Sequence, residues 1–268
     1  MNKIVVGAAL AGLLAIGALA LALGGPAGTA EEPHDQRFGL MTSLPIYRAP
    51  QASVADMLDQ AGDEAHWLRS AVEAHNTLEP LDLLDAKSLA GIDTLLLVQP
   101  RALTPAEYVA LDDWVRGGGK VLLVADPMLT SEPHFALGDP RNPQAVSLSG
   151  PILARWGLEL VADEGEGHGH DHGIDGDEAG HAADHEVELD GHTLPVTYGG
   201  TFEKRPPAGG DPADCSLRNA GLIAVCQIVE GRAVVVADAT VFERNSGSGD
   251  AAGVLWVLLG MMRDAPGE

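Results

Sequence analysis

The chain is poor in aromatic residues, in cysteine and in basic residues. Aromatic side chains make up 4% of the sequence, so aliphatic side chains must fill any core. The two cysteines are too few for a disulfide-rich scaffold and lack the spacing of a zinc site. The 16 Lys and Arg residues face 39 Asp and Glu residues, which gives a formal net charge of -23. An acidic surface repels phosphate groups, which argues against nucleic acid as a partner and disfavours binding to anionic lipid headgroups.

Three motifs of common enzyme classes are also missing. The sequence contains no G-x-S-x-G run, so it has no nucleophile elbow of the hydrolase kind. The glycines at 117–119 follow a predicted helix and are followed by Lys120 and Val121. A phosphate-binding loop instead lies between a strand and its helix, with Ser or Thr after the Lys. No G-x-G-x-x-G run occurs, so the dinucleotide fingerprint is absent as well.

Residues 103–126 contain a predicted helix, its end and a buried strand in one stretch. Thr104, Pro105 and Glu107 have the spacing of an N-terminal capping box. Apolar residues then recur at helical spacing up to the glycines at 117–119, which end the helix. Residues 94–98 and 121–125 are apolar runs without alternation, as in strands buried on both faces of a parallel sheet. Strand, helix and strand form one right-handed crossover unit, so we predict an α/β fold with a mostly parallel sheet flanked by helices.

The rest of the chain supplies shorter elements around this unit. Residues 202–214 are rich in Pro and Gly and are predicted to form a loop. Strands are predicted at residues 37–43, 77–84, 158–162, 186–189, 193–198, 222–229 and 233–237, and helices at residues 63–74, 150–156 and 251–263.

The amino-terminal segment has the features of a targeting signal. Residues 4–25 contain no charged side chain and are long enough to span a bilayer as a helix. Lys3 before this run, with Glu31 and Glu32 after it, places the amino terminus in the cytoplasm. A cleaved signal peptide is the alternative, since residues 28–30 resemble a small-residue cleavage site. We expect a transmembrane anchor or signal peptide at residues 1–25, a linker at 26–36 and an α/β domain at 37–268.

These assignments predict where the protein resides. With a retained anchor, the chain lies in the inner membrane with its amino terminus inside and its folded domain in the periplasm. With a cleaved signal peptide, the folded domain is released into the periplasm.

Two strands end with the same Ala-Asp pair. Residues 121–126 end in Asp126 and residues 234–238 end in Asp238. In an open parallel sheet, ligands bind beyond the carboxyl ends of the strands. Asp126, Asp238 and the strand end at Thr42 and Ser43 therefore form a candidate ligand-binding rim. The alternative is that each Asp begins the next turn or caps the next helix, as Asp commonly does.

A tract at about residues 164–186 is biased toward Gly, His, Asp and Glu, and we expect it to be a disordered insertion. Neutral imidazoles and carboxylates suit zinc, nickel or copper, but the spacing matches no fixed zinc motif. The tract either binds such metals weakly or has no chemical role. Its candidate ligands are His168, His170, His172, His181 and His185.

The two cysteines, Cys215 and Cys226, are candidates for a disulfide in an oxidising exported compartment. Because Cys226 lies in an apolar predicted strand, a buried free thiol is the alternative. The sequence does not show whether the two side chains face each other.

Three segments together resemble a known family. They are DTLLLVQP from Asp93, LTPAEYVALDDWVRGGGKVLLVADP from Leu103 and GRAVVVADATVFE from Gly231. They look like the exported domain of gliding-motility-type ABC transporter auxiliary proteins, and the resemblance covers roughly residues 38–126 and 231–262. It implies a flavodoxin-like sheet related to class I glutamine amidotransferases, without the amidotransferase nucleophile. It also implies a membrane-attached, non-catalytic domain associated with a transport system, and it transfers no active-site residue to this chain.

From these observations we expect a membrane-anchored, exported domain without enzymatic activity or cofactor. It would bind a small ligand or a partner protein, such as a transporter or another envelope protein, at the rim near Asp126 and Asp238. An envelope metal-binding protein that uses the His-rich tract is the first alternative. A hydrolase that holds a metal at the two aspartates is the second.

Overall fold

The computed structural model describes residues 35–47, 65–131, 133, 135–139, 141–162, 185–211, 213–243 and 249–263. The chain divides into two compact units, residues 1–35 and 36–268, and the elements below belong to the second. The predicted anchor and most of the predicted linker lie outside the described residues. Among the helices that the structure does describe, none combines the length and the apolar character needed to cross a membrane.

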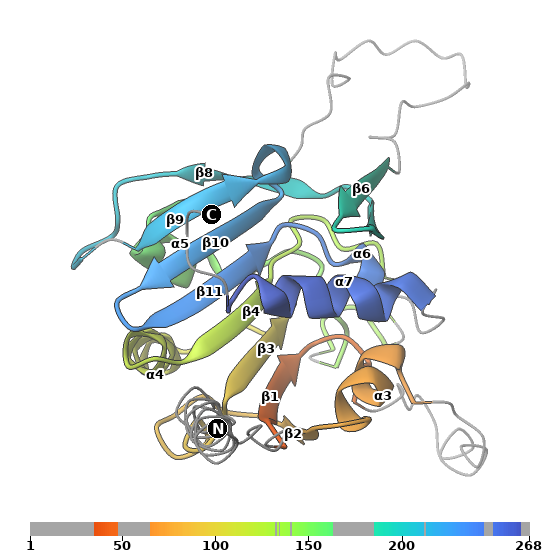
Figure 1. The fold of residues 1–268 in the computed structure, drawn as a ribbon, viewed down its shortest axis with the longest axis horizontal. Coiled ribbons are helices and arrows are strands. Elements are labelled where there is room, and N and C mark those ends of the chain that lie inside the picture. Colours follow the sequence, from red (N-terminus) through yellow and green to blue (C-terminus); the bar gives the residue numbers. More distant parts are fainter. Residues whose placement is uncertain are drawn as a thin grey trace, which may run out of the picture. The chain divides into compact units, whose positions relative to one another are not determined.

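A mixed sheet of seven strands forms the centre of the domain, in the order β2-β1-β3-β4-β11-β10-β9 (Figure 1). The first five strands in this order are parallel to their neighbours, whereas β10 is antiparallel to both β11 and β9. Counted along the chain, the parallel strands have the order 2-1-3-4-5, so the strand order reverses between β1 and β3. The strands of this sheet are β1 (Arg37–Thr42), β2 (Thr77–Pro80), β3 (Thr94–Val98), β4 (Lys120–Val124), β9 (Asp214–Arg218), β10 (Ile223–Ile228) and β11 (Gly231–Val236).

Helices cover both faces of this sheet. On one face α3 packs against α7, and α7 crosses the sheet in Figure 1. On the other face α4 packs against α5. The described helices are α3 (Trp67–Glu73), α4 (Pro105–Arg116), α5 (Gly150–Trp156), α6 (Thr240–Glu243) and α7 (Gly249–Gly260), with a short 3-10 turn η2 (Asn219–Gly221).

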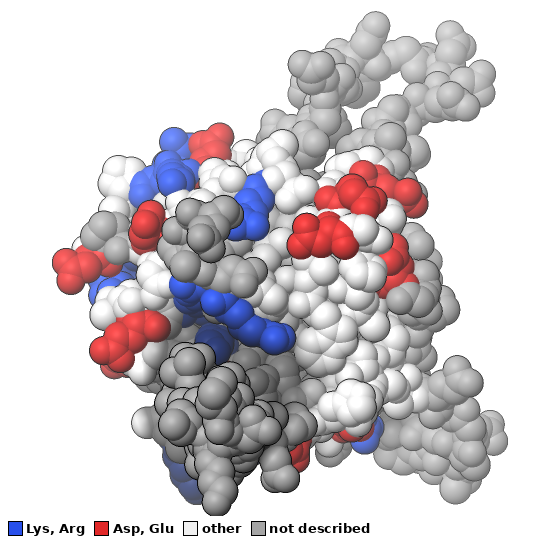
Figure 2. All heavy atoms as spheres, viewed as in Figure 1, with Lys and Arg blue, Asp and Glu red and all other residues white. Residues whose placement is uncertain are grey.

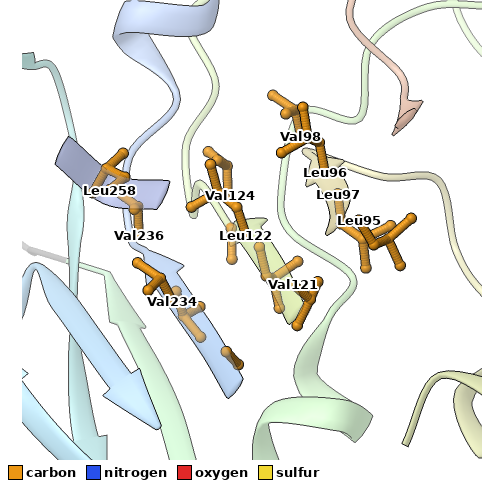
Figure 3. Close-up of a cluster of buried hydrophobic side chains, with 14 of the residues drawn as sticks. Leu95, Leu96, Leu97, Val98, Val121, Leu122, Val124, Val234, Val236 and Leu258 are labelled. Atoms are coloured by element: carbon orange, nitrogen blue, oxygen red, sulfur yellow. The ribbon is translucent and has the colours of Figure 1, made fainter. Parts of the chain in front are cut away.

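The core lies where β3, β4 and β11 run side by side. Figure 3 shows their Leu and Val side chains in one cluster with Leu258 of α7. Every residue of β3 is buried, and β4 is buried after Lys120. Their parallel pairing sets Leu95 opposite Val121 and Val98 opposite Val124. The prediction of an α/β sheet built on these two strands is therefore confirmed.

Helix α4 begins and ends largely as the sequence predicts. The backbone N–H of Glu107 donates to Oγ1 of Thr104, the Glu107 carboxylate accepts from the N–H of Thr104, and Pro105 occupies the first turn. At the other end the left-handed residue is Gly118, with φ of 107°, whereas Gly117 keeps a negative φ. The helix therefore exits through the second of the three glycines.

The prediction of a loop at residues 202–214 is wrong at both of its ends. Strand β8 (Gly200–Lys204) pairs with β5 (Leu158–Ala162) in a two-stranded antiparallel sheet. Strand β9 begins at Asp214 and forms an edge of the main sheet. Only one residue of β9, Cys215, is buried, so the strand has no apolar run that the sequence could reveal. A second small sheet, β6 (His185–Leu189) with β7 (His192–Val196), corresponds to the predicted hairpin.

Candidate functional site

Asp126 and Asp238 follow two neighbouring parallel strands. Strand β4 pairs with β11 in a register that sets Val124 opposite Val236. Each aspartate comes two residues after its strand, so both lie at the carboxyl edge of the sheet. Both residues have 0% exposed surface. The structure thus places the two predicted rim residues close together but beneath the surface.

The carboxylate of Asp126 binds backbone groups of two different segments. Its Oδ1 accepts from the N–H of Met128 at 2.7 Å, and its Oδ2 accepts from the N–H of Ala239 at 2.8 Å. The second bond joins the end of β4 to the turn after β11. Burial, with a further contribution from the negative charges of Asp238 and Glu243, raises the pKa of Asp126 to about 7.

Asp238 is held in the same manner. Its Oδ1 accepts from the N–H of Thr240 at 2.8 Å, and its Oδ2 accepts from the N–H of Thr197 at 3.0 Å. The hydroxyl of Thr240 lies 3.2 Å from the same Oδ2. Burial raises the pKa of Asp238 to about 6, and the charge of Glu243 acts in the same direction. The carboxylate therefore ties the loop after β7 to the end of β11.

Two carboxyl groups with raised pKa values have the acidity that general acid–base chemistry needs near neutral pH. Here, however, their oxygens accept hydrogen bonds from four backbone N–H groups, and neither side chain reaches the surface. Within the described ranges, no group of three or more His, Cys, Asp or Glu side chains is arranged to hold a metal ion. Ligand binding through Asp126 and Asp238 stays a prediction, and their observed contacts are those of residues that anchor loops.

Gln99 occupies the position where the strand order reverses. It follows β3, has 0% exposed surface and a φ of 43°. Its side-chain amide pairs with the main chain of Asp126, because Nε2 donates to the carbonyl at 3.1 Å and Oε1 accepts from the N–H at 2.9 Å. Its Nε2 also donates to the carbonyl of Gln144 at 2.9 Å. Sequence reasoning missed this residue; a polar side chain between a buried strand and Pro100 was the available signal.

Ser43 belongs to the same network, whereas Thr42 does not. The hydroxyl of Ser43 donates to the carbonyl of Gln99 at 2.6 Å and accepts from the N–H of Gln144 at 3.0 Å. The loop that contains Gln144 is therefore hydrogen-bonded to the residues that follow both β1 and β3. Thr42 instead accepts from the N–H of Leu44 and lines a separate hollow of about 270 Å³ between the ends of β1 and β2. The predicted rim residues thus divide between two places.

A larger groove lies beside the buried aspartates. Its volume is about 590 Å³, and it runs along β5 between that strand, α5 and the loop after Asp126. Pro127, directly after Asp126, forms part of its wall. Val146 also lines it and is 51% exposed. Most of the remaining lining is apolar, with Glu159 and Arg205 as an exposed ion pair. Apolar concavities with a few polar groups are the common form of binding sites.

The predicted metal ligands fall mainly outside the described residues. His168, His170, His172 and His181 lie there, while His185 begins β6 and is exposed. The suggestion of weak zinc, nickel or copper binding therefore stays a prediction.

Cys215 and Cys226 are joined by a disulfide with an S–S distance of 2.03 Å. The two residues lie directly opposite each other in the antiparallel pairing of β9 with β10. The bond therefore attaches the edge strand to the sheet interior.

With this geometry in place, the chain can be compared with known proteins. Residues 40–164 match the model of a family described as "ABC-type uncharacterized transport system". The match runs from β1 through β5 and supports an ABC transporter auxiliary family. No curated protein matches the chain.

Similar folds occur among solved structures at low sequence identity. The mmIFT52 N-terminal domain has a TM-score of 0.50 and 14% identity, covering 87% of this chain and 99% of that domain. Cytoplasmic Protein STM1381 from Salmonella typhimurium LT2 has a TM-score of 0.42 and 10% identity, with coverage of 85% and 99%. Exo-beta-1,4-mannosidase Op5Man5 from Opitutaceae bacterium strain TAV5 has a TM-score of 0.41 and 13% identity. The alignment covers 76% of this chain and 31% of that enzyme. The first likeness concerns the fold alone, and the other two carry no argument about function.

Proposed function

We propose that this chain is a non-catalytic accessory component of an ABC-type transport system, anchored in the membrane by residues 4–25 with its α/β domain outside the cytoplasm. The observation that carries the proposal is the family match across residues 40–164. That stretch includes the central strands β1, β3 and β4 and the groove-lining β5.

The absence of catalysis is supported by the chemistry of the rim. The groups best suited to acid–base work, Asp126 and Asp238, are buried and accept hydrogen bonds from the chain's own backbone. At the strand reversal, where an α/β enzyme would hold its ligand, the buried side chain of Gln99 bonds to the main chain of Asp126 and Gln144, and the N–H of Gln144 bonds to Ser43.

Export is supported by two independent features. The run at residues 4–25 has no charged side chain, with Lys3 before it and Glu31 and Glu32 after it. The disulfide between β9 and β10 is of a kind that persists in oxidising compartments outside the cytoplasm.

The groove along β5 is the proposed contact surface for a transporter subunit. Val146 at its rim is half exposed, and Met128 on the adjoining loop is 51% exposed. Exposed apolar side chains beside a concave apolar surface mark protein contacts. The groove lies at the carboxyl edge of the sheet, because Pro127 in its wall follows the strand-end Asp126.

A photo-crosslinking amino acid at position 146 of the full chain tests the proposal in cells. We expect a crosslink to a permease or ATPase subunit of an ABC transporter, identified by mass spectrometry, and its loss when Met128→Glu is added to the same chain, because Met128 is 51% exposed on the adjoining loop. Position 83 is the matched control, because Leu83 is 50% exposed and lies in the loop before β3. An equal crosslink from position 83, or turnover by the purified chain that Asp126→Ala abolishes, would contradict the proposal. Release of the full chain from membranes by alkaline carbonate would contradict the anchor.

Metal binding by the His-rich tract is a separate proposal that rests on composition. Calorimetry with zinc, nickel and copper on the full chain and on a deletion of residues 165–183 tests it. The deletion stops short of β6, so the hairpin that begins at His185 is kept. Equal metal binding by both proteins would refute the proposal.

A further inference from the structure

Three basic side chains surround one hollow at the amino edge of the sheet. Lys120 begins β4 and lies directly opposite Arg232 of β11 in their parallel register. Arg263, which follows α7, lines the same hollow, whose volume is about 310 Å³. The one acidic side chain in its lining is Glu230, at the turn between β10 and β11. Lys120 and Arg263 are exposed.

This grouping runs against the composition of the chain. With 16 basic residues against 39 acidic ones, most surface regions are expected to be acidic. Figure 2 shows Lys and Arg side chains at the left and centre of the face in view. Asp and Glu side chains lie among them at the left and form a further group at the upper right. Basic side chains are therefore grouped locally on a chain whose formal net charge is -23.

The amino edge is also where the chain enters the domain. Strand β1 begins at Arg37, and the register sets Phe38 opposite Thr94 and Thr94 opposite Lys120. Arg37 itself is paired with Glu79 at 2.6 Å and does not line the hollow. Residues 26–36 separate the apolar run from β1. Eleven residues span at most about 40 Å when fully extended, which limits how far this edge can lie from any membrane that holds residues 4–25.

We propose that the surface formed by Lys120, Arg232 and Arg263 binds the anionic phospholipid headgroups of the membrane in which the chain is anchored. The inference rests on the anchoring part of the proposed function and adds an orientation to it. With the amino edge on the membrane, the groove along β5 points away from the lipid, because it lies at the opposite, carboxyl edge of the sheet. The acidic remainder of the surface is repelled by the same headgroups, which favours this one orientation.

The experiment uses the full chain reconstituted into nanodiscs of phosphatidylcholine, with or without phosphatidylglycerol. Hydrogen exchange is followed at residues 118–120 and 230–232. We expect slower exchange in the anionic discs and loss of this protection at high salt, because salt screens charges beyond about 10 Å. Each basic residue near an anionic surface changes the ratio of docked to free domains by roughly fivefold. The double variant Lys120→Glu/Arg263→Glu should therefore lower this ratio by at least about 25-fold.

The double variant Lys204→Glu/Arg218→Glu is the matched control, because it changes the net charge by the same amount. Arg218 ends β9 at the level of Val236, which is the carboxyl edge of the sheet, and this variant should keep the protection. Equal exchange in both lipids would overturn the inference, as would equal loss in the two variants. Protection by inorganic phosphate without anionic lipid would show a small-anion site instead and would also overturn it. If the chain fails to enter the discs, the anchor itself is wrong and the inference falls with it.

Discussion

Replacement of Asp126 by Asn measures how unfavourable it is to hold an ionised carboxylate at the end of β4. Burial raises the pKa of Asp126 to about 7 from an ordinary value of 3.8. Between about pH 4 and pH 7 the native state therefore keeps a proton that the unfolded chain has released. The stability that this group contributes is fully present at acidic pH and is lost as the pH rises toward 7. The slope approaches about 1.4 kcal/mol per pH unit.

From about pH 5 to about pH 7, this effect removes about 2 kcal/mol from the unfolding free energy of the wild type. The side-chain amide of Asp126→Asn cannot ionise, so the variant is spared this loss. Asn also has one acceptor oxygen where Asp126 uses two, for the N–H groups of Met128 and Ala239. The variant should therefore be less stable at acidic pH, by about 1–3 kcal/mol for one buried N–H left without an acceptor. The deficit should shrink by about 2 kcal/mol at neutral pH.

The assay is urea unfolding of both proteins at each pH, followed by tryptophan fluorescence. Other groups with shifted pKa values, such as His66 and Glu107, titrate equally in both proteins and cancel in the difference. The exposed Asp113→Asn supplies a control with the same change of charge. A stability difference between wild type and Asp126→Asn that does not depend on pH would show that the carboxyl group is not held as the structure indicates. A deficit that grows with pH would show the same.

Three further predictions concern stability. Replacing Cys215 and Cys226 by Ala should lower the unfolding free energy by about 3 kcal/mol, because the disulfide closes a loop with a sequence separation of 11 and so restricts the unfolded chain. Denaturant titration measures this loss, and reduction of the wild-type disulfide should lower the unfolding free energy by the same amount. Gly231→Ala should lower the unfolding free energy by about 3 kcal/mol or more, because a Cβ at this position overlaps the main chain at the end of α4. Gly150→Ala is the control and should leave the stability nearly unchanged, because nothing lies within 4 Å of a Cβ there. Thermal unfolding of the two variants measures both effects. Glu107→Gln should cost about 2–4 kcal/mol, since this nearly buried carboxylate accepts from an arginine and two backbone N–H groups. Its pKa is lowered to about 2, so the stability it adds is present above about pH 4.5 and lost as the pH falls toward 2, and the variant should lack this acid sensitivity.

The central part of the fold can be predicted from the sequence because several signals agree there. The capping box at Thr104, the glycines after α4 and two unbroken apolar runs all indicate the same strand–helix–strand unit, and the structure contains it. The edges of the fold lack such signals. Strand β9 buries one side chain, and β8 is specified by pairing with β5 rather than by its own pattern. Long-range pairing of this kind leaves little trace in local sequence.

The candidate site shows the same division. The repeated Ala-Asp ending indicated that Asp126 and Asp238 belong to one edge, but spacing alone does not show whether a carboxylate faces water or a backbone N–H. That distinction depends on the loops after β4 and β7, which carry no regular pattern. Asp112 illustrates the same problem on α4, because it lies off the apolar stripe yet is buried. There it accepts hydrogen bonds from Arg116, Arg155 and Trp156.

The cross-strand disulfide has a consequence for biogenesis. Strand β9 is the outermost strand of the sheet and buries little, so its attachment depends on its pairing with β10 and on the Cys215–Cys226 bond. If the chain is exported as proposed, it would lack this disulfide until after secretion, because cytosolic thiols stay reduced. An edge strand held by pairing alone separates from the sheet more easily, which would suit passage through a translocation channel as an extended polypeptide. Oxidation outside the cytoplasm would then attach β9 covalently to the sheet.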